Sequence, residues 1–318
     1  GHLVPVMLLR LLARHGHTPI AVVGGITAQI GDPSGRRTER SLLAAETVRA
    51  NVQTIGAQLR ALLGGDSAIL DNRAWLQGRD AVDFLRDLGP HVPVSRLLAS
   101  ETVSSRLDAG TGLSFLEFAY PLFQAADFLE LHRSRSCRLQ IGGSDQWGNI
   151  TVGADVVRRI TGQRVFGLTQ PLVTTASGAK MGKTADGAVW LDPAHTDDHA
   201  FYQFWRDCAD ADVGRFLRLF TDVPLGEIAE LESLPGAEIN RAKKRLAFEV
   251  TALVRGPEAA DRARQAAEAV FEGAGDEAGL PELCLDAARL DTSGIPLAEI
   301  LHDGGLATSR SAARRLLD

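Results

Sequence analysis

A glycine-rich segment at residues 24–40 carries Asp32, Arg36 and Arg40 directly after a short apolar run. Such a run is typical of a buried strand, so the segment is predicted to be a loop at the end of that strand. Glycines in such a loop let backbone N–H groups approach a phosphate or a small ligand closely. Asp32 could then bind an ammonium group, and the two arginines could bind phosphate oxygens. A surface turn with solvated arginines is the alternative, because Asp-Pro-Ser-Gly is also a turn sequence.

A second glycine-rich segment, at residues 140–150, repeats this design. It also follows a short apolar run, and it contains Asp145 and Gln146. A carboxylate at this position suits two ribose hydroxyls, and an amide suits a carboxylate or a ribose. The alternative is a helix N-terminus with Ser144 as its cap. Because two unrelated strand ends have the same design, the pair favours a nucleotide site.

Three polar side chains, Tyr120, Gln124 and Asp127, are spaced four and three residues apart. That spacing places them on one face of a predicted helix. The face is otherwise apolar, so the three polar groups should be buried together and should need partners. A polar ligand would supply those partners, and a structural hydrogen-bond cluster is the alternative.

Two lysines, Lys180 and Lys183, stand three residues apart in a segment rich in Gly, Ser and Thr. Such a segment could close over a polyphosphate and stabilise the charge of its transition state. The lysines could equally belong to a solvated loop. This segment taken alone favours the solvated loop.

The elements predicted from hydrophobic periodicity place the first three of these groups of residues in an α/β domain over residues 1–172. They are helices at 3–15, 41–63, 81–88 and 115–131, the last of them amphipathic, and strands at 19–24, 68–72 and 138–141. Helices that alternate with short apolar strands predict a doubly wound, Rossmann-like parallel sheet. Ligands bind such sheets at the carboxyl ends of the strands, where both glycine-rich segments stand.

The rest of the chain is predicted to be helical. A mobile connection at 173–196 leads to a small all-α domain at 197–272, with helices at 199–220, 225–233, 237–255 and 257–272. Residues 273–294 have the Gly, Asp and Pro content of a linker. Residues 295–318 are too few to bury a core, so they are predicted to begin a third module.

Composition limits the classes of function. The 318 residues are 45% hydrophobic with a net charge of −6, which suits a folded chain without a general attraction to nucleic acid. Basic clusters at 36–40, 241–245 and 310–315 could provide local contacts, although each is typical of a solvated helix face. No apolar run is long enough to span a bilayer, and three separated cysteines indicate neither disulfides nor a zinc site. We therefore expect a cytoplasmic protein with no membrane contact and no protein-held metal.

Taken together, three segments resemble the bacterial tyrosyl-tRNA synthetases, a family of class I aminoacyl-tRNA synthetases. The matching segments are GDPSGRRTER at 31–40, GGSDQWGN at 142–149 and KMGKT at 180–184. The last is similar to the K-M-S-K-S signature of that class. Gly1 and His2 resemble the second half of its H-I-G-H signature, so we expect further residues before Gly1. Residues 295–318 resemble the beginning of the family's small basic RNA-binding module.

The resemblance implies a tyrosine–tRNA ligase, in which the tyrosine carboxylate attacks the α-phosphate of ATP to give tyrosyl-adenylate. Tyrosine then passes to the 3′ end of tRNA(Tyr). The residues implied to bind tyrosine are Asp32, Tyr120 and Gln124 at the ammonium, Asp127 at the phenol, and Gln146 at the carboxylate. Asn72 and Trp75 are part of a segment, DNRAW, that is similar to a substrate-side loop.

The resemblance also implies how ATP is bound. The nucleotide would contact Gly1, His2, Gly143, Asp145 and Lys183. The transition state would be stabilised by His2, Arg36, Arg40, Lys180, Lys183 and Thr184. ATP would enter as a substrate with Mg²⁺ on its phosphates. The family further implies a homodimer formed through the α/β domain, near residues 80–130.

Three alternatives remain open at this stage. Pro121 and Ala126 also resemble the related tryptophanyl enzymes, although the 142–149 segment favours tyrosine. The chain could instead be a non-catalytic tRNA-binding paralogue or fragment, against which the intact lysines at 180 and 183 argue. Another nucleotidyltransferase on the same fold is the third alternative, and it would leave the helical domain without a purpose.

Overall fold

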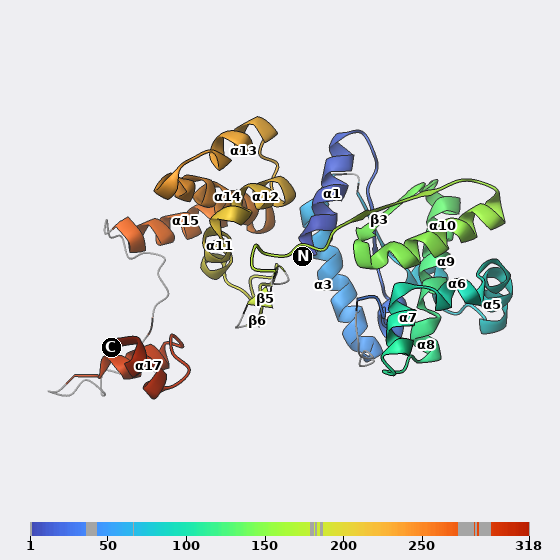
Figure 1. Ribbon diagram of the computed structural model, residues 1–318, viewed down its shortest axis with the longest axis horizontal. Coiled ribbons are helices and arrows are strands. Elements are labelled where there is room, and N and C mark those ends of the chain that lie inside the picture. Colours follow the sequence, from blue (N-terminus) through green and yellow to red (C-terminus); the bar gives the residue numbers. More distant parts are fainter. Residues whose placement is uncertain are drawn as a thin grey trace. The chain divides into compact units, whose positions relative to one another are not determined.

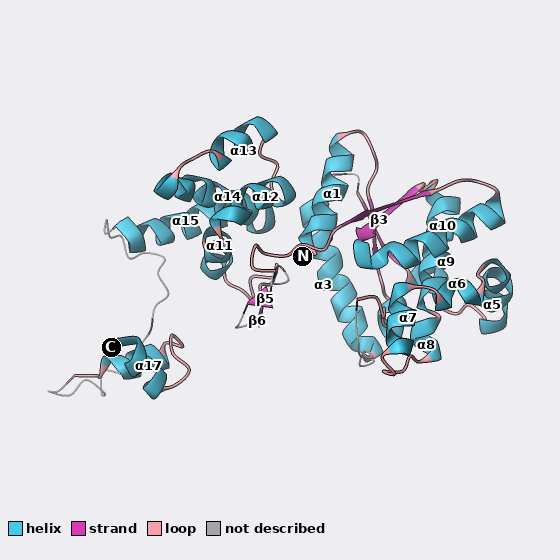
Figure 2. Cartoon of the chain, in the orientation of Figure 1, coloured by secondary structure: helices cyan, strands magenta, loops and turns pink. Residues whose placement is uncertain are grey.

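The computed structural model describes residues 2–35, 43–65, 67–178, 181, 183–184, 187–272, 283, 285 and 294–317. The backbone divides into two compact units, Gly1–Asp261 and Arg262–Asp318. Helices make up most of the described residues, and the strands are short (Figure 2). No helix within these ranges is long and apolar enough to cross a bilayer.

Two parallel strand pairs form the α/β part of the first unit. They consist of β1 (Ile20–Val23) with β2 (Ala68–Asp71), and β3 (Leu139–Gly143) with β4 (Phe166–Gln170). In register, Ile20 is opposite Ala68 and Leu139 is opposite Phe166. The first pair is connected through α3 (Ala45–Leu63) and the second through α10 (Trp147–Thr161). Each pair therefore has the helical crossover that parallel strands require.

The three predicted strands are confirmed, with small differences at their ends, but the single doubly wound sheet is not. In the described residues the two pairs are separate two-stranded sheets, because β1 and β3 are not hydrogen-bonded to each other. A cavity lies between them, and it is lined by Val22 of β1 and by Gln140 and Ile141 of β3. The coarser expectation of parallel strands connected by helices is correct.

The other helices of this part surround the strands (Figure 1). They are α1 (Leu3–Arg14), α2 (Thr27–Ile30), α4 (Arg73–Leu76), α5 (Ala81–Leu88), α6 (Val94–Leu98), α7 (Glu101–Asp108), α8 (Phe115–Phe118) and α9 (Tyr120–Arg135), with 3-10 turns at Gly89–His91 and Ser144–Gln146. Helix α5 shows how the sequence sets a boundary, because the Asp80 carboxylate accepts hydrogen bonds from the N–H groups of Val82 and Asp83. Such a cap satisfies N–H groups that have no partner within the helix.

The helix predicted at 115–131 differs from the structure in two respects. It is divided at Ala119 into α8 and α9, because Pro121 has no N–H group to continue the hydrogen-bond ladder. It is also not simply amphipathic, since the five consecutive residues Ala125–Leu129 are all buried. Helix α9 packs against α10 and fills the core with Phe128, which is fully buried, so tertiary packing overrides the expected exposed face.

Two other predicted helices also have different bounds. The helix predicted at 41–63 begins only at Ala45, because Ala44 is extended; residues 41 and 42 lie outside the described residues. The helix predicted at 199–220 is divided into α11 (Asp198–Arg206) and α12 (Asp210–Phe220). Ala209 is extended between them, and acidic residues in the first turn of α12 favour a new helix start there.

The helical part of the first unit has its own aromatic core. Its elements are α11, α12, α13 (Leu225–Glu232), a 3-10 turn at Gly236–Glu238, and α14 (Ile239–Arg255), preceded by the antiparallel strands β5 (Lys183–Thr184) and β6 (Gly187–Ala188). Trp205 of α11 is nearly buried, with its ring edge-on to Phe216 and Phe220 of α12. Such aromatic contacts join α11 to α12.

The second unit contains α16 (Leu297–Asp303) and α17 (Arg310–Leu317), while α15 (Pro257–Glu272) spans the division between the units. Helices α16 and α17 pack against each other, and Arg310 pairs with Glu299 at 2.9 Å. The predicted linker at 273–294 lies mostly outside the described residues.

Candidate active site

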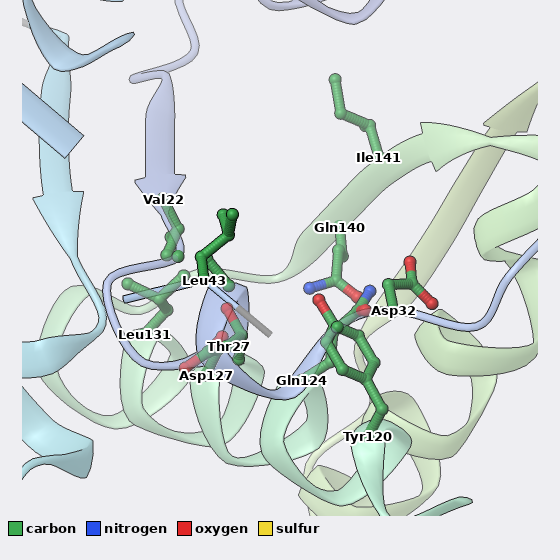
Figure 3. A pocket seen from close by; sticks show the side chains of 13 residues that line it. Val22, Thr27, Asp32, Leu43, Tyr120, Gln124, Asp127, Leu131, Gln140 and Ile141 are labelled. Carbon is green, nitrogen blue, oxygen red and sulfur yellow. The ribbon is translucent and has the colours of Figure 1, made fainter. Parts of the chain in front are cut away.

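A cavity of about 780 Å³ lies beside the carboxyl-terminal end of β1 and the first part of β3. Four of the residues predicted to bind tyrosine line it, namely Asp32, Tyr120, Gln124 and Asp127. Figure 3 shows Tyr120, Gln124 and Asp127 on α9 beneath the cavity, with Asp32 on the neighbouring loop. The helical spacing and the glycine-rich loop therefore come together at one place, as the sequence predicts.

Asp127 is the buried acid of this site, with 7% of its surface exposed. Its Oδ1 accepts a hydrogen bond from Trp75 Nε1 at 2.7 Å, and its Oδ2 accepts one from Asn72 Nδ2 at 3.1 Å. Burial raises the pKa of Asp127 to about 6, although both hydrogen bonds lower it. The carboxylate is therefore ionised at neutral pH and protonated in mild acid.

Asn72 holds this end of the cavity together. It follows β2 and is fully buried. Its Oδ1 accepts from the N–H of Ile26 at 2.9 Å, and its Nδ2 donates to Thr27 Oγ1 at 2.9 Å as well as to Asp127. Both ends of one amide are thus used to join the first glycine-rich loop to α9. Asn72 and Trp75 are thus the two donors to the Asp127 carboxylate, and the contact of Asn72 with the substrate stays a prediction.

The second glycine-rich segment holds the side chain of Asp32. Its Oδ2 accepts a hydrogen bond from Gln146 Nε2 at 2.7 Å, and its Oδ1 accepts from the N–H of Ser34 at 2.9 Å. Asp32 and Gln146 are far apart in the sequence, so this contact joins the two glycine-rich segments that the sequence predicts at two separate strand ends.

Asn149 belongs to the same network, although the motif assignment passes over it. Its side chain is nearly buried, and Nδ2 lies 3.0 Å from Gln124 Oε1, 3.4 Å from Asp32 Oδ1 and 3.5 Å from Gln146 Oε1. One amide therefore lies among three of the predicted tyrosine ligands. The sequence contains one signal for this role: Asn149 follows Gln146 by three residues, which places both side chains on one face of a helical stretch.

Gln140 is a second residue that sequence reasoning did not assign. It lies on β3 and lines the same cavity as Tyr120 (Figure 3). Its Oε1 is buried and has no hydrogen-bond partner within the described part of the chain. A buried acceptor without a partner is costly, so a donor on a bound ligand would satisfy it.

Two residues predicted to bind the nucleotide, Gly143 and His2, lie near Asp145, which has the same predicted role. A Cβ atom added at Gly143 would lie 2.4 Å from Asp145 Oδ1, and one added at Gly35 would lie 3.7 Å from Asp145 Cβ. Only a glycine therefore fits at 143 without moving Asp145. Desolvation lowers the pKa of His2, and the negative charge of Asp145 opposes this shift, so the two side chains influence each other.

Several residues predicted to bind the nucleotide or its phosphates cannot be placed. Gly1, Arg36, Arg40 and Lys180 lie outside the described residues. For Lys183 and Thr184 only the backbone is described, and it forms β5, with Lys183 opposite Ala188.

The basic cluster at 241–245 on α14 is mostly paired with acids. Lys243 lies 2.6 Å from Asp210, and Arg245 lies 2.6 Å from Glu227. This agrees with a charged helix surface. Among the side chains that the structure describes, no group of three or more His, Cys, Asp or Glu is placed to hold a metal ion.

Comparison with known proteins identifies the family. The model of the tRNA synthetases class I (W and Y) matches residues 1–272. The tyrosine–tRNA ligases of Caulobacter vibrioides strain NA1000 and of Rhodospirillum rubrum are each 50% identical to the chain. The matches cover 99% and 100% of this chain, and 76% and 77% of those proteins, respectively.

Solved structures agree with this result. The C-terminally truncated mitochondrial tyrosyl-tRNA synthetase of Aspergillus nidulans has a TM-score of 0.75 and 30% identity, covering 84% of this chain and 81% of that one. The tryptophanyl-tRNA synthetase of Campylobacter jejuni has a TM-score of 0.52 and 16% identity, covering 98% of this chain and 89% of that one, and shares the fold alone. The chain therefore belongs to the class I tRNA synthetases of tryptophan and tyrosine, and within them to the tyrosine–tRNA ligases.

Proposed function

We infer that this chain activates L-tyrosine with ATP in the cavity beside β1 and β3 and then transfers it to tRNA(Tyr). The observation that carries the inference is the buried Asp127 carboxylate, which lines the cavity and is held by Asn72 and Trp75. A phenol hydroxyl is a donor that such an acceptor distinguishes from a bare phenyl ring.

The opposite end of the substrate is bound at Asp32. The substrate ammonium lies among the Asp32 carboxylate, the Tyr120 hydroxyl and the Gln124 amide oxygen, which line the same cavity. In Figure 3, Asp32 and Asp127 stand on different sides of the cavity, as the two ends of one tyrosine require. The Gln146 amide, which contacts Asp32, then faces the substrate carboxylate.

The reaction is an in-line displacement on ATP. A tyrosine carboxylate oxygen attacks the α-phosphorus, the bond from this phosphorus to the β-phosphate oxygen breaks, and pyrophosphate leaves. The ribose is bound by Asp145 beside Gly143, and the nucleotide also contacts Gly1 and His2. The developing charge is stabilised by His2, Arg36, Arg40, Lys180, Lys183 and Thr184. Mg²⁺ arrives on the ATP phosphates as part of the substrate.

Transfer to tRNA completes the reaction, because a hydroxyl of the terminal ribose attacks the adenylate carbonyl and AMP leaves. We further propose a catalytic domain of parallel strands connected by helices over residues 1–172 and a helical domain over 197–272 on the anticodon side. Residues 295–318 then belong to an RNA-binding module. The enzyme works in the cytoplasm, without membrane contact.

The active form is a homodimer that pairs through α5–α8. These helices gather at one end of the α/β part (Figure 1), and their exposed apolar side chains include Val82, Val94, Leu107 and Phe115. Phe115 is the most exposed, at 74%. Several exposed apolar side chains on neighbouring helices favour a protein–protein contact there.

The test is ATP–pyrophosphate exchange with tyrosine, tryptophan and phenylalanine in parallel. We expect exchange with tyrosine alone. Exchange with tryptophan instead would contradict the assigned substrate, and no exchange with any of the three would favour the non-catalytic alternative. Asp127→Ala should remove the preference for tyrosine over phenylalanine while the KM for ATP stays the same. Asp207→Ala, at the exposed C-terminal end of α11 and outside the proposed dimer surface, is the matched control and should change neither.

A further inference from the structure

A buried carboxylate outside the cavity contacts the backbone that leads to the lysine segment 180–183. Asp212 is in the first turn of α12 and has 2% of its surface exposed. Its Oδ2 accepts a hydrogen bond from the N–H of Ala176 at 2.7 Å. Its Oδ1 accepts one from Arg215 Nη2 at 2.7 Å, and Arg215 also donates to the carbonyl oxygen of Thr174. One carboxylate oxygen therefore binds the backbone of Ala176, and the other binds Arg215, which itself binds the backbone of Thr174.

The backbone next to this contact continues to the lysines. The N–H of Met181 donates to the carbonyl oxygen of Val173 at 3.0 Å, and the Met181 side chain is buried with 7% exposure. In the sequence, Lys180 precedes Met181 and Lys183 follows it by two residues. Asp212 thus lies at the base of a backbone loop that is closed between residues 173 and 181.

The other end of α12 is attached to the element that follows His2. Asp222, two residues after the last residue of α12, pairs with Arg10 at 2.9 Å and also pairs with Arg14. Both arginines belong to α1, which begins directly after His2. Helix α12 therefore contacts the backbone that leads to the lysine segment at one end and α1, which follows His2, at the other.

We propose that Asp212 is a positioning residue for tyrosine activation, which sets the place of the lysine segment relative to α1 through helix α12. It touches neither substrate, and it acts through the backbone of residues 174–176. The proposal rests on the proposed function, because it requires Lys180 and Lys183 to act on the ATP phosphates. A backbone that is already held at residues 174–176 loses less conformational entropy when the residues after it bind the phosphates.

The experiment compares Asp212→Ala with Asp210→Asn as its matched control. Asp210 is in the same turn of α12, but its side chain is exposed and pairs with Lys243 at 2.6 Å. For Asp212→Ala we expect kcat of tyrosine-dependent exchange to fall between about fivefold and 100-fold, the range for losing a buried charged hydrogen bond. The dissociation constant of tyrosine, measured by equilibrium dialysis, should stay within about twofold, because the cavity is untouched. Asp210→Asn should change neither quantity.

Asp212→Asn provides a second variant that keeps the shape of the side chain and one acceptor for Ala176. It should lose less activity than Asp212→Ala, and it carries the test if the alanine variant does not fold. A structural readout is cleavage by trypsin after Lys180 and Lys183, which should be faster in Asp212→Ala than in Asp210→Asn.

Three outcomes separate the inferences. Equal kcat values for Asp212→Ala and the control would overturn the role of Asp212. A loss of tyrosine affinity as large as the loss of kcat would also overturn it, since the effect would then be a general disturbance of the fold. No exchange by the unaltered protein would refute the proposed function itself, whereas normal exchange together with an unaffected Asp212→Ala variant would refute only this inference.

Discussion

The raised pKa of Asp127 leads to a sharp prediction about substrate choice and pH. Burial shifts this pKa from 3.8 to about 6, so the carboxylate is ionised above pH 6 and protonated below it. Its two oxygens already accept hydrogen bonds from Trp75 and Asn72. Protonation puts a hydrogen on an oxygen that must accept from the phenol, so recognition of tyrosine should weaken as the pH falls.

The size of the effect follows from the ionised fraction. With a pKa of about 6, roughly nine-tenths of Asp127 is ionised at pH 7 and roughly one-tenth at pH 5. The ratio of kcat/KM for tyrosine to that for phenylalanine should therefore fall about tenfold between these pH values. Dividing by the phenylalanine value removes the titration of ATP and of shared groups, because phenylalanine uses the same site without the phenol contact.

The assay is ATP–pyrophosphate exchange at pH 5 to 8 with both amino acids, on the unaltered protein and on Asp127→Asn. The variant cannot ionise at this position, so its ratio should be low and independent of pH. A ratio that stays constant in the unaltered protein, or that rises toward pH 5, would refute the assignment of Asp127 to the phenol.

The same shift affects stability with a defined sign. Because the folded-state pKa is above the unfolded value, the proton is bound more tightly in the folded state. The resulting stabilisation is fully present below about pH 4 and is lost as the pH rises through about 6, and it amounts to about 3 kcal/mol. Urea unfolding of the unaltered protein and of Asp127→Asn should show a difference that changes with pH over this interval. A constant difference would contradict the raised pKa.

Three further predictions concern other parts of the molecule. Lys183→Ala should lower the rate of adenylate formation far more than tyrosine affinity, as stopped-flow and binding measurements would show; equal losses would mean that its role is wrong. Phe115→Asp should shift the dimer toward monomer in sedimentation experiments, because it places a charge on the exposed apolar surface of α5–α8; an unchanged dimer would place the interface elsewhere. Glu117→Ala should lower the free energy of unfolding by about 3–5 kcal/mol, since the guanidinium of Arg106 would remain buried without its partner at 2.9 Å; a change under about 1 kcal/mol would contradict that account.

Local pattern predicted much of the secondary structure. The strands near residues 20, 68 and 139 are short apolar runs that end in polar or glycine residues, which is a signal read within a few neighbouring residues. The division of α9 from α8 could also be seen locally, because Pro121 removes an N–H group. By contrast, the burial of five consecutive residues in α9 depends on α10 packing against it, which periodicity does not report.

The amino-acid sequence alone determined the family, the segments that carry the chemistry and the three polar residues on one face of α9. A motif is defined by its residue types and their spacing. It can therefore be recognised without knowing which residues lie near it in the folded chain. Only the tertiary structure decided which groups hold those residues: Asn72 and Trp75 at Asp127, and Asn149 among the tyrosine ligands. These contacts join residues that are 25 to 55 positions apart, and the contact between Asp212 and Ala176 joins residues 36 positions apart. Folding sets such distances through packing, because the energy of each contact depends on burial and geometry that no local pattern contains.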